Sequence, residues 1–172
     1  MSSIALEDTV ILWDCSRSMV RTDFKPNRLR TIQKLIKLFI EHKIAKDPKD
    51  SIAIAAIGTR IIKLADFSNN SEFLTKQLNK LELSGNANIV DGIAFALQML
   101  VKKIRHLGGS TQRIIIFTDS SIPDLEPERI QKITRAAQGL GVYVDICQLG
   151  LSEMDRALNP YRKLANATNA EY

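Results

Sequence analysis

The sequence predicts an α/β protein with a doubly wound, mostly parallel central sheet, helices on both faces and one antiparallel edge hairpin. Residues 9–13 and 113–118 are continuous apolar runs, which are typical of strands covered on both faces. Segments with helical periodicity alternate with such runs along the chain. The strand-like runs 51–57 and 60–67 are separated by only two residues. Because a parallel crossover needs about a dozen residues, these two strands must be antiparallel.

The first helix lies between Pro26, which suits a first helical turn, and Pro48, which marks its end. Its apolar residues recur at helical spacing, and Arg30, Lys34 and Lys37 lie on the opposite side. Those apolar residues are Leu29, Ile32, Leu35, Ile36, Phe39 and Ile40. The pattern predicts a helix that packs one face on the sheet.

The second half of the chain continues the alternation of helices and strands. After a short helix over 71–81, Asn88 is expected to cap the next helix, and Asp91 could reach back to it near the positive N-terminal end. The strand over 113–118 ends at Asp119. The remaining elements are a helix over 124–138, a strand over 142–147 and a last helical region divided by Pro160.

Length and composition indicate a single domain over residues 1–172. Cys15 and Cys147 are the only cysteines, too few for a thiolate zinc site, and no apolar run reaches the roughly 18 residues of a membrane span. We therefore expect a cytoplasmic protein with no membrane partner. The formal charge of +5 permits acidic partners, but no aromatic residues interleave with the basic ones. Nucleic acid is therefore not expected as a direct ligand.

Two acidic side chains stand directly after predicted parallel strands, where α/β sheets bind their ligands. Asp14 and Asp119 are expected to face one crevice, and two carboxylates without a counter-charge attract a cation. Ser16 and Ser18 add neutral oxygens from the first loop. Such an oxygen-only set predicts a weak site for Mg²⁺ or Mn²⁺. The alternative is that Asp14, Ser16 and Ser18 only shape the loop by bonding its amides.

The D-x-S-x-S pattern of Asp14, Ser16 and Ser18, the segment GNANIVDGIAFAL and the run IIIFTDS with Asp119 resemble the metal-ion-dependent adhesion site of von Willebrand factor A (VWA) domains. The resemblance extends over nearly the whole chain. It implies a Rossmann-like fold and a non-catalytic protein-interaction module, in which a divalent ion bridges to a carboxylate of the partner. That family usually supplies a threonine where this chain has Ala87, so we expect a degenerate site that binds metal weakly.

The start of the first helix, K-P-N-R-L, and the insertion before it are similar to the VWA subunit of the transcription and repair factor TFIIH. The proteasomal ubiquitin-receptor VWA subunit is a more distant resemblance. The first resemblance implies a scaffold that docks onto other subunits, including a helicase. The second implies a scaffold in a proteasome-type complex.

An enzyme is the competing interpretation of the same loop. Residues 15–22, CSRSMVRT, have the spacing of tyrosine-phosphatase phosphate loops, which would make Cys15 a nucleophile and Arg21 a phosphate ligand. A phosphate cradle needs turned backbone amides, usually with glycine, and a cationic environment that lowers the thiol pKa. This loop has no glycine, and Asp14 and Asp119 would raise that pKa. We therefore expect no catalytic residues.

Overall fold

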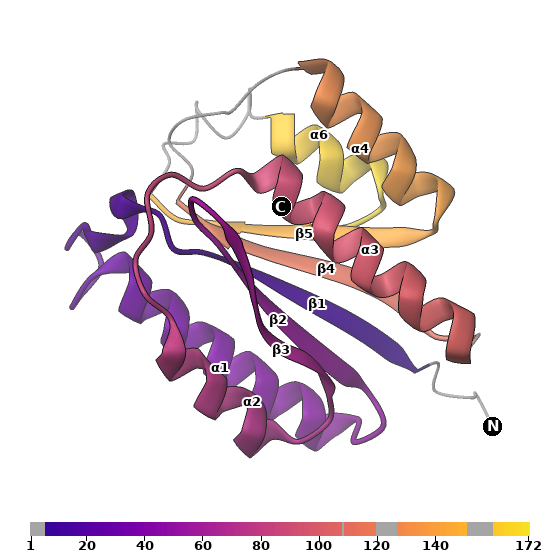
Figure 1. The fold of residues 1–172 in the computed structure, drawn as a ribbon, viewed down its shortest axis with the longest axis horizontal. Helices are drawn as coiled ribbons and strands as arrows, with labels where there is room; N and C mark the ends of the chain where they lie inside the picture. Colours follow the sequence, from indigo (N-terminus) through magenta and orange to yellow (C-terminus); the bar gives the residue numbers. More distant parts are fainter. Residues whose placement is uncertain (1–5, 108, 120–126, 151–159) are drawn as a thin grey trace.

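The computed structural model describes residues 6–107, 109–119, 127–150 and 160–172 (Figure 1). The elements in chain order are β1 (Glu7–Asp14), η1 (Arg17–Val20), α1 (Arg28–Lys46), β2 (Ser51–Ile57), β3 (Ile61–Ser68), α2 (Ser71–Gln77), η2 (Leu78–Lys80), α3 (Ile89–Leu107), β4 (Thr111–Thr118), α4 (Pro127–Gly139), β5 (Val142–Gln148) and α6 (Pro160–Ala167), where η marks a 3₁₀ helix. The first predicted residues of the fourth helix, 124–126, and the helical region before Pro160 lie outside the described residues.

The central sheet confirms the predicted fold class. Its strand order is β3-β2-β1-β4-β5, and only the β2–β3 pair is antiparallel. β1 lies between β2 and β4, with Asp14 opposite Ile57 and Trp13 opposite Phe117. Because β1 and β4 are parallel neighbours, Asp14 and Asp119 come to the same edge of the sheet.

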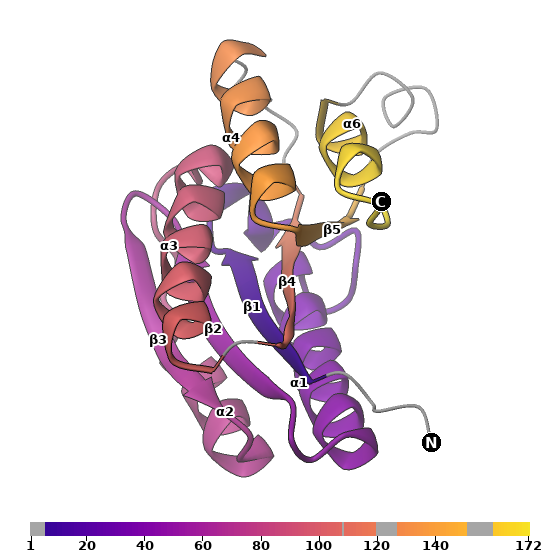
Figure 2. The same ribbon diagram turned by 90° about the vertical axis from the view of Figure 1, so that its right-hand side faces the viewer.

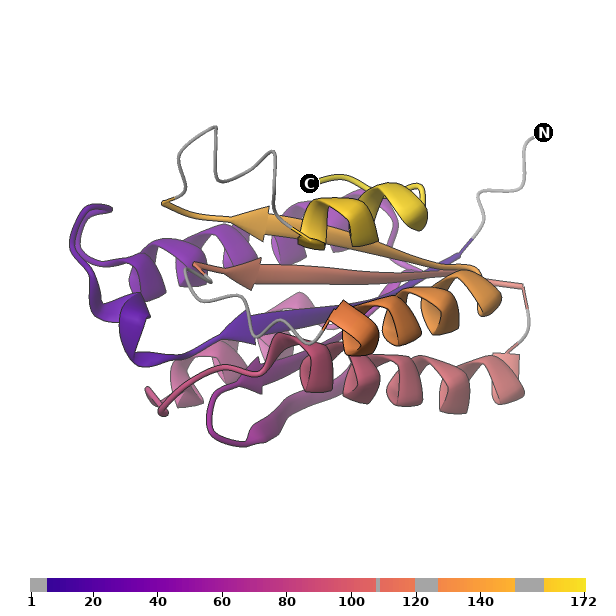
Figure 3. The same cartoon turned by 90° about the horizontal axis from the view of Figure 1, so that it is seen from above.

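The helices cover the two faces of the sheet unequally. α3, α4 and α6 lie over one face, and α1 and α2 lie over the other (Figures 1 and 3). Figure 2 shows α3 and α4 on the side opposite α1. Alternate residues of β1 feed the two cores: Val10 and Leu12 join the α3 side, whereas Ile11 and Trp13 join the α1 side. None of the helices within the described ranges is long and apolar enough to cross a membrane.

Side-chain caps explain where the long helices begin. The Asn27 side chain accepts a hydrogen bond from the backbone nitrogen of Arg30 at 2.9 Å, which starts α1. The predicted cap of α3 is confirmed, because Asn88 Oδ1 accepts from the Asp91 backbone nitrogen at 3.1 Å. The predicted reach of Asp91 back to Asn88 is replaced by a contact with Arg129 of α4, which links the two helices.

Candidate functional site

The two predicted acidic residues meet in one buried crevice at the carboxyl ends of β1 and β4. Asp14 and Asp119 are each 1% exposed. Asp14 Oδ1 accepts from the backbone nitrogen of Ser16 at 2.8 Å, and its Oδ2 accepts from Thr118 Oγ1 at 2.6 Å. Burial raises the pKa of Asp14, helped by the charge of Asp119 and opposed by these hydrogen bonds.

The two predicted serines connect the acidic residues. η1 begins after Ser16 and carries Ser18 toward β4. Their hydroxyl oxygens lie 2.9 Å apart, and Ser18 Oγ donates to Asp119 Oδ1 at 2.6 Å. The structure therefore brings Asp14, Ser16, Ser18 and Asp119 into one hydrogen-bonded group, as the loop-shaping alternative requires.

A buried arginine supplies positive charge to the crevice. The first residue of α1, Arg28, has a side chain that is only 5% exposed, and its Nη1 donates to Asp119 Oδ2 at 2.8 Å. Its Nε lies 2.9 Å from Asp23 Oδ1, and its Nη2 lies 2.5 Å from Asp23 Oδ2. The bonds to Asp23 and then to Asp119 raise the pKa of Arg28 against the effect of burial. Arg28 therefore stays charged and neutralises Asp119.

A glycine makes room for this guanidinium. Gly150, which follows β5, has φ +80, a backbone conformation that side chains disfavour. A Cβ atom at this position would lie 2.4 Å from Nη2 of Arg28 and 2.7 Å from its Cζ. The guanidinium is therefore held between Gly150, Asp23 and Asp119.

Sequence reasoning missed Arg28 and its partner Asp23. The available signal was an arginine in the first turn of a helix, where the positive end of the helix dipole disfavours a cation. A basic residue in such a position needs a nearby carboxylate. Asp119 is 91 residues away in the chain, so local spacing gives no hint of the pair.

The crevice side chains, as arranged, do not fit a divalent cation. Both oxygens of Asp14 and both oxygens of Asp119 accept hydrogen bonds from the chain itself. Ala87 packs against the apolar core and offers no oxygen from its side chain. The described part of the chain contains no group of three or more His, Cys, Asp or Glu side chains placed to hold a metal. A Mg²⁺ or Mn²⁺ site stays a prediction, and it requires Arg28 to leave Asp119.

The cysteine of the phosphatase interpretation is in an unsuitable environment. Cys15 is 2% exposed, and its thiol donates to the backbone oxygen of Ile57 at 3.2 Å. Burial and then the charge of Asp14 raise the pKa of Cys15 to about 11. Such a thiol is almost fully protonated at neutral pH, and Arg21 is exposed on the surface. The geometry favours a packing role for Cys15.

The raised pKa of Asp14 predicts a pH dependence. A group of this kind contributes its full stability below its ordinary pKa of 3.8, and the contribution is lost as pH rises through the raised folded value. Asp14→Asn, which stays neutral, is expected to gain in free energy of unfolding relative to the wild type between about pH 3 and pH 7. Urea titrations across this range measure the difference. Asp66→Asn is the control with the opposite slope, because Lys63 lowers the pKa of Asp66. A flat Asp14→Asn difference would contradict the prediction.

The loops around the crevice expose apolar and basic side chains. Among the described residues, three of the nine exposed large apolar side chains lie here, with exposed fractions of 49%, 39% and 44%. The loop after η2 is tied to the first loop, because Ser84 donates its backbone N–H to the backbone oxygen of Cys15 at 2.9 Å. We define the crevice rim as the exposed residues Arg17, Val20, Arg21, Phe24, Lys25 and Leu83.

The doubly wound sheet and the crevice at its carboxyl ends define an α/β protein that binds ligands at a topological switch point. A model of the von Willebrand factor type A domain matches residues 9–121. The chain belongs to this family.

Relatives with printed functions are proteasomal. The chain is 27% identical over 168 residues to the 26S proteasome regulatory subunit rpn10 of Schizosaccharomyces pombe, covering 97% of this chain and 68% of that protein. It is 26% identical over 149 residues to 26S proteasome non-ATPase regulatory subunit 4 of Caenorhabditis elegans, covering 87% of this chain and 42% of that protein. The crystal structure of the SpRpn10 VWA domain has the same fold, with a TM-score of 0.81, 22% identity, and coverage of 98% of this chain and 88% of that one.

Family and relatives together support a protein-interaction module that acts within a complex. The start of the first helix made TFIIH the nearer resemblance, but similarity over the whole chain favours the proteasomal subunits. A TFIIH-like role and a helicase partner find no support in these similarities.

Proposed function

We propose that this chain is a non-catalytic scaffold that binds other subunits of a proteasome-type complex through its crevice rim. The observation that carries the proposal is the gathering of exposed apolar side chains and unpaired basic side chains on loops that a buried network holds in place. Val20 and Phe24 offer apolar contact area, and Arg17, Arg21 and Lys25 lie beside them in the chain. This chemistry suits a partner surface that combines apolar and acidic residues.

The crevice beneath the rim acts as support in this proposal. The Arg28–Asp119 ion pair fixes the end of β4 to the start of α1, and the bond from Arg28 to Asp23 extends the support into the first loop. A preformed loop loses less conformational entropy on binding than a mobile one. The proposal therefore needs no bound metal. A cytoplasmic location belongs to the same proposal.

Capture from a lysate of the source cells tests this function. The tagged chain is expected to retain proteasome subunits, identified by mass spectrometry, with or without EDTA. Phe24→Glu is expected to reduce the captured amount at least tenfold, because it places a charge in the apolar part of the rim. Phe73→Glu, which changes an equally exposed phenylalanine on α2, is the matched control and should leave capture unchanged. Loss of capture in EDTA would favour the metal-bridged alternative, and capture without proteasome subunits would contradict the proposal.

A further inference from the structure

One face of the sheet is left open beside α1. On the α3 side, the side chains of β4 and β5 are buried in the larger core. On the α1 side, alternate residues of the same strands are only partly buried: Arg113, Ile115, Tyr143, Asp145 and Cys147. Parallel strands are normally covered on both faces, and β4 is an interior strand. Within the described ranges, this part of the sheet therefore lacks one of its two covering layers.

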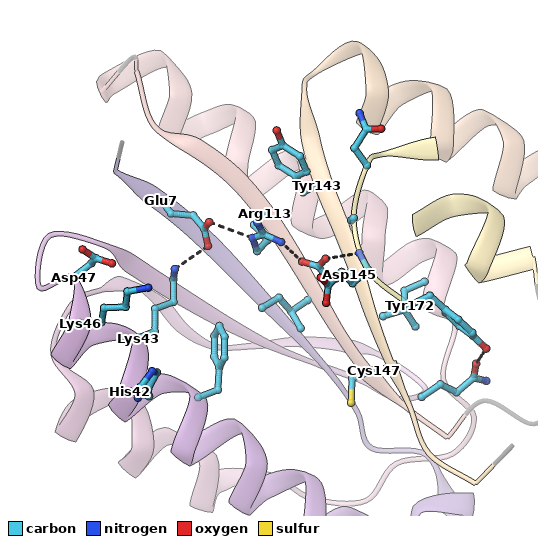
Figure 4. A pocket seen from close by; sticks show the side chains of 17 residues that line it. Glu7, His42, Lys43, Lys46, Asp47, Arg113, Tyr143, Asp145, Cys147 and Tyr172 are labelled. Carbon is cyan, nitrogen blue, oxygen red and sulfur yellow. Dashed lines mark hydrogen bonds and ion pairs between the residues drawn. The ribbon is translucent and has the colours of Figure 1, made fainter. Parts of the chain in front are cut away.

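The open face forms the floor of a groove of about 830 Å³. α1 makes one wall with Phe39, His42 and Lys46, and residues 169–172 make the opposite wall. Figure 4 shows Arg113 and Asp145 between these walls, with Cys147 farther along β5. The groove lies on a face of the sheet, so it is separate from the crevice rim.

Ion pairs across the groove floor neutralise most of its charges. Lys43 lies 2.8 Å from Glu7 and 2.9 Å from Asp50, and Arg113 pairs with both Glu7 and Asp145. Although burial raises the pKa of Glu7, the bonds from Lys43 and the charge of Arg113 lower it further than burial raises it. The floor therefore presents little net charge.

The two walls differ in charge. Lys46 on the α1 wall and Glu171 on the opposite wall line the groove, and neither side chain has an ion pair or hydrogen bond within the described part of the chain. Asp47, which ends α1, lies beside Lys46. An occupant would meet positive charge along α1, at His42 and Lys46, and negative charge along the C-terminal wall.

We propose that this groove binds an amphipathic helix of a partner protein, with its apolar stripe on Ile115 and Cys147, an acidic side chain facing Lys46 and a basic side chain facing Glu171. The spacing fits, because Arg113 and Ile115 lie about 7 Å apart along β4 and helix residues four apart are separated by about 6 Å. A helix laid in an apolar groove is a recurring mode of recognition, and opposite charges on its two flanks fix its direction. This inference goes beyond the proposed function and does not depend on it.

Selection from a displayed library of 20-residue helical peptides tests the groove, with the folded chain as the target. Enriched peptides are expected to carry apolar residues at helical spacing, acidic residues on one flank and basic residues on the other. Fluorescence anisotropy with a selected peptide is expected to give at least tenfold weaker binding for Ile115→Arg. Lys46→Glu is expected to weaken binding several-fold, and less so at high salt because salt screens the charge.

Matched controls lie on other sides of α1. Leu38→Arg and Lys34→Glu change exposed residues that do not line the groove, so both should bind like the wild type. Lys46→Glu alters an exposed side chain and keeps the test valid if Ile115→Arg unfolds. Failure to select peptides, or selected peptides that ignore both groove variants, would overturn the proposal. A dimer in analytical ultracentrifugation that Ile115→Arg dissolves would also overturn it, because a second copy would then be the occupant. Phe24→Glu should leave peptide binding unchanged.

Discussion

Arg28→Met is expected to lower the free energy of unfolding by about 3–5 kcal/mol, measured by urea titration at neutral pH. The side chains of Arg28 and Asp119 are 5% and 0% exposed, so water cannot replace the lost partner. Without the guanidinium, the Asp119 carboxylate keeps only the hydrogen bond from Ser18. Removing one member of a buried ion pair costs more than the pair contributed, because it leaves an uncompensated charge.

Two further variants separate the charge from the loss of packing. Adding Asp119→Asn to Arg28→Met is expected to restore much of the lost stability, since the double variant has no unpaired charge. Asp23→Asn is expected to cost far less, because Asp23 is exposed to water. A loss below about 1 kcal/mol in Arg28→Met would contradict the assignment of Arg28 as the counter-charge. A cation at Asp119 would then become the better explanation.

The fold could be predicted because its signals are local. A two-residue connection between residues 51–57 and 61–68 leaves no alternative to an antiparallel pair. Asp14 and Asp119 could be placed together because each directly follows a parallel strand, and only the order of β1 and β4 in the sheet had to be inferred. Ser16 and Ser18 then follow from their nearness to Asp14.

The missing parts of the site depend on contacts between distant residues. Nothing within a few positions of Arg28 indicates Asp119 or Gly150, because burial of the guanidinium arises only when α1, β4 and β5 come together. The groove was missed for a related reason. The run RIIIFT indicates a strand covered on both faces, but Ile115 is only partly covered because no described helix lies over β4 beside α1. Sequence periodicity shows which residues are apolar, and not which neighbour is absent.

Gly150→Ala is expected to lower the free energy of unfolding by about 2–4 kcal/mol, as the sum of two effects. The first is backbone strain, because φ is +80 and a side chain in this region costs about 1–2 kcal/mol. The second is displacement of Arg28, since the new Cβ would lie 2.4 Å from Nη2. A free arginine side chain could move aside at little cost. This one is fixed at both ends of its guanidinium by Asp23 and Asp119, so it must give up a bond to move.

Gly141→Ala isolates the backbone effect, because Gly141 has φ +66 and nothing lies within 4 Å of its added Cβ. The excess cost of Gly150→Ala over Gly141→Ala therefore measures the pressure on the guanidinium. In the Arg28→Met background this excess should disappear, since the shorter side chain has no guanidinium to displace. Equal costs for the two glycine variants in the wild-type background would show that Gly150 does not hold Arg28 in place. An excess that persists without Arg28 would point to another contact of residue 150.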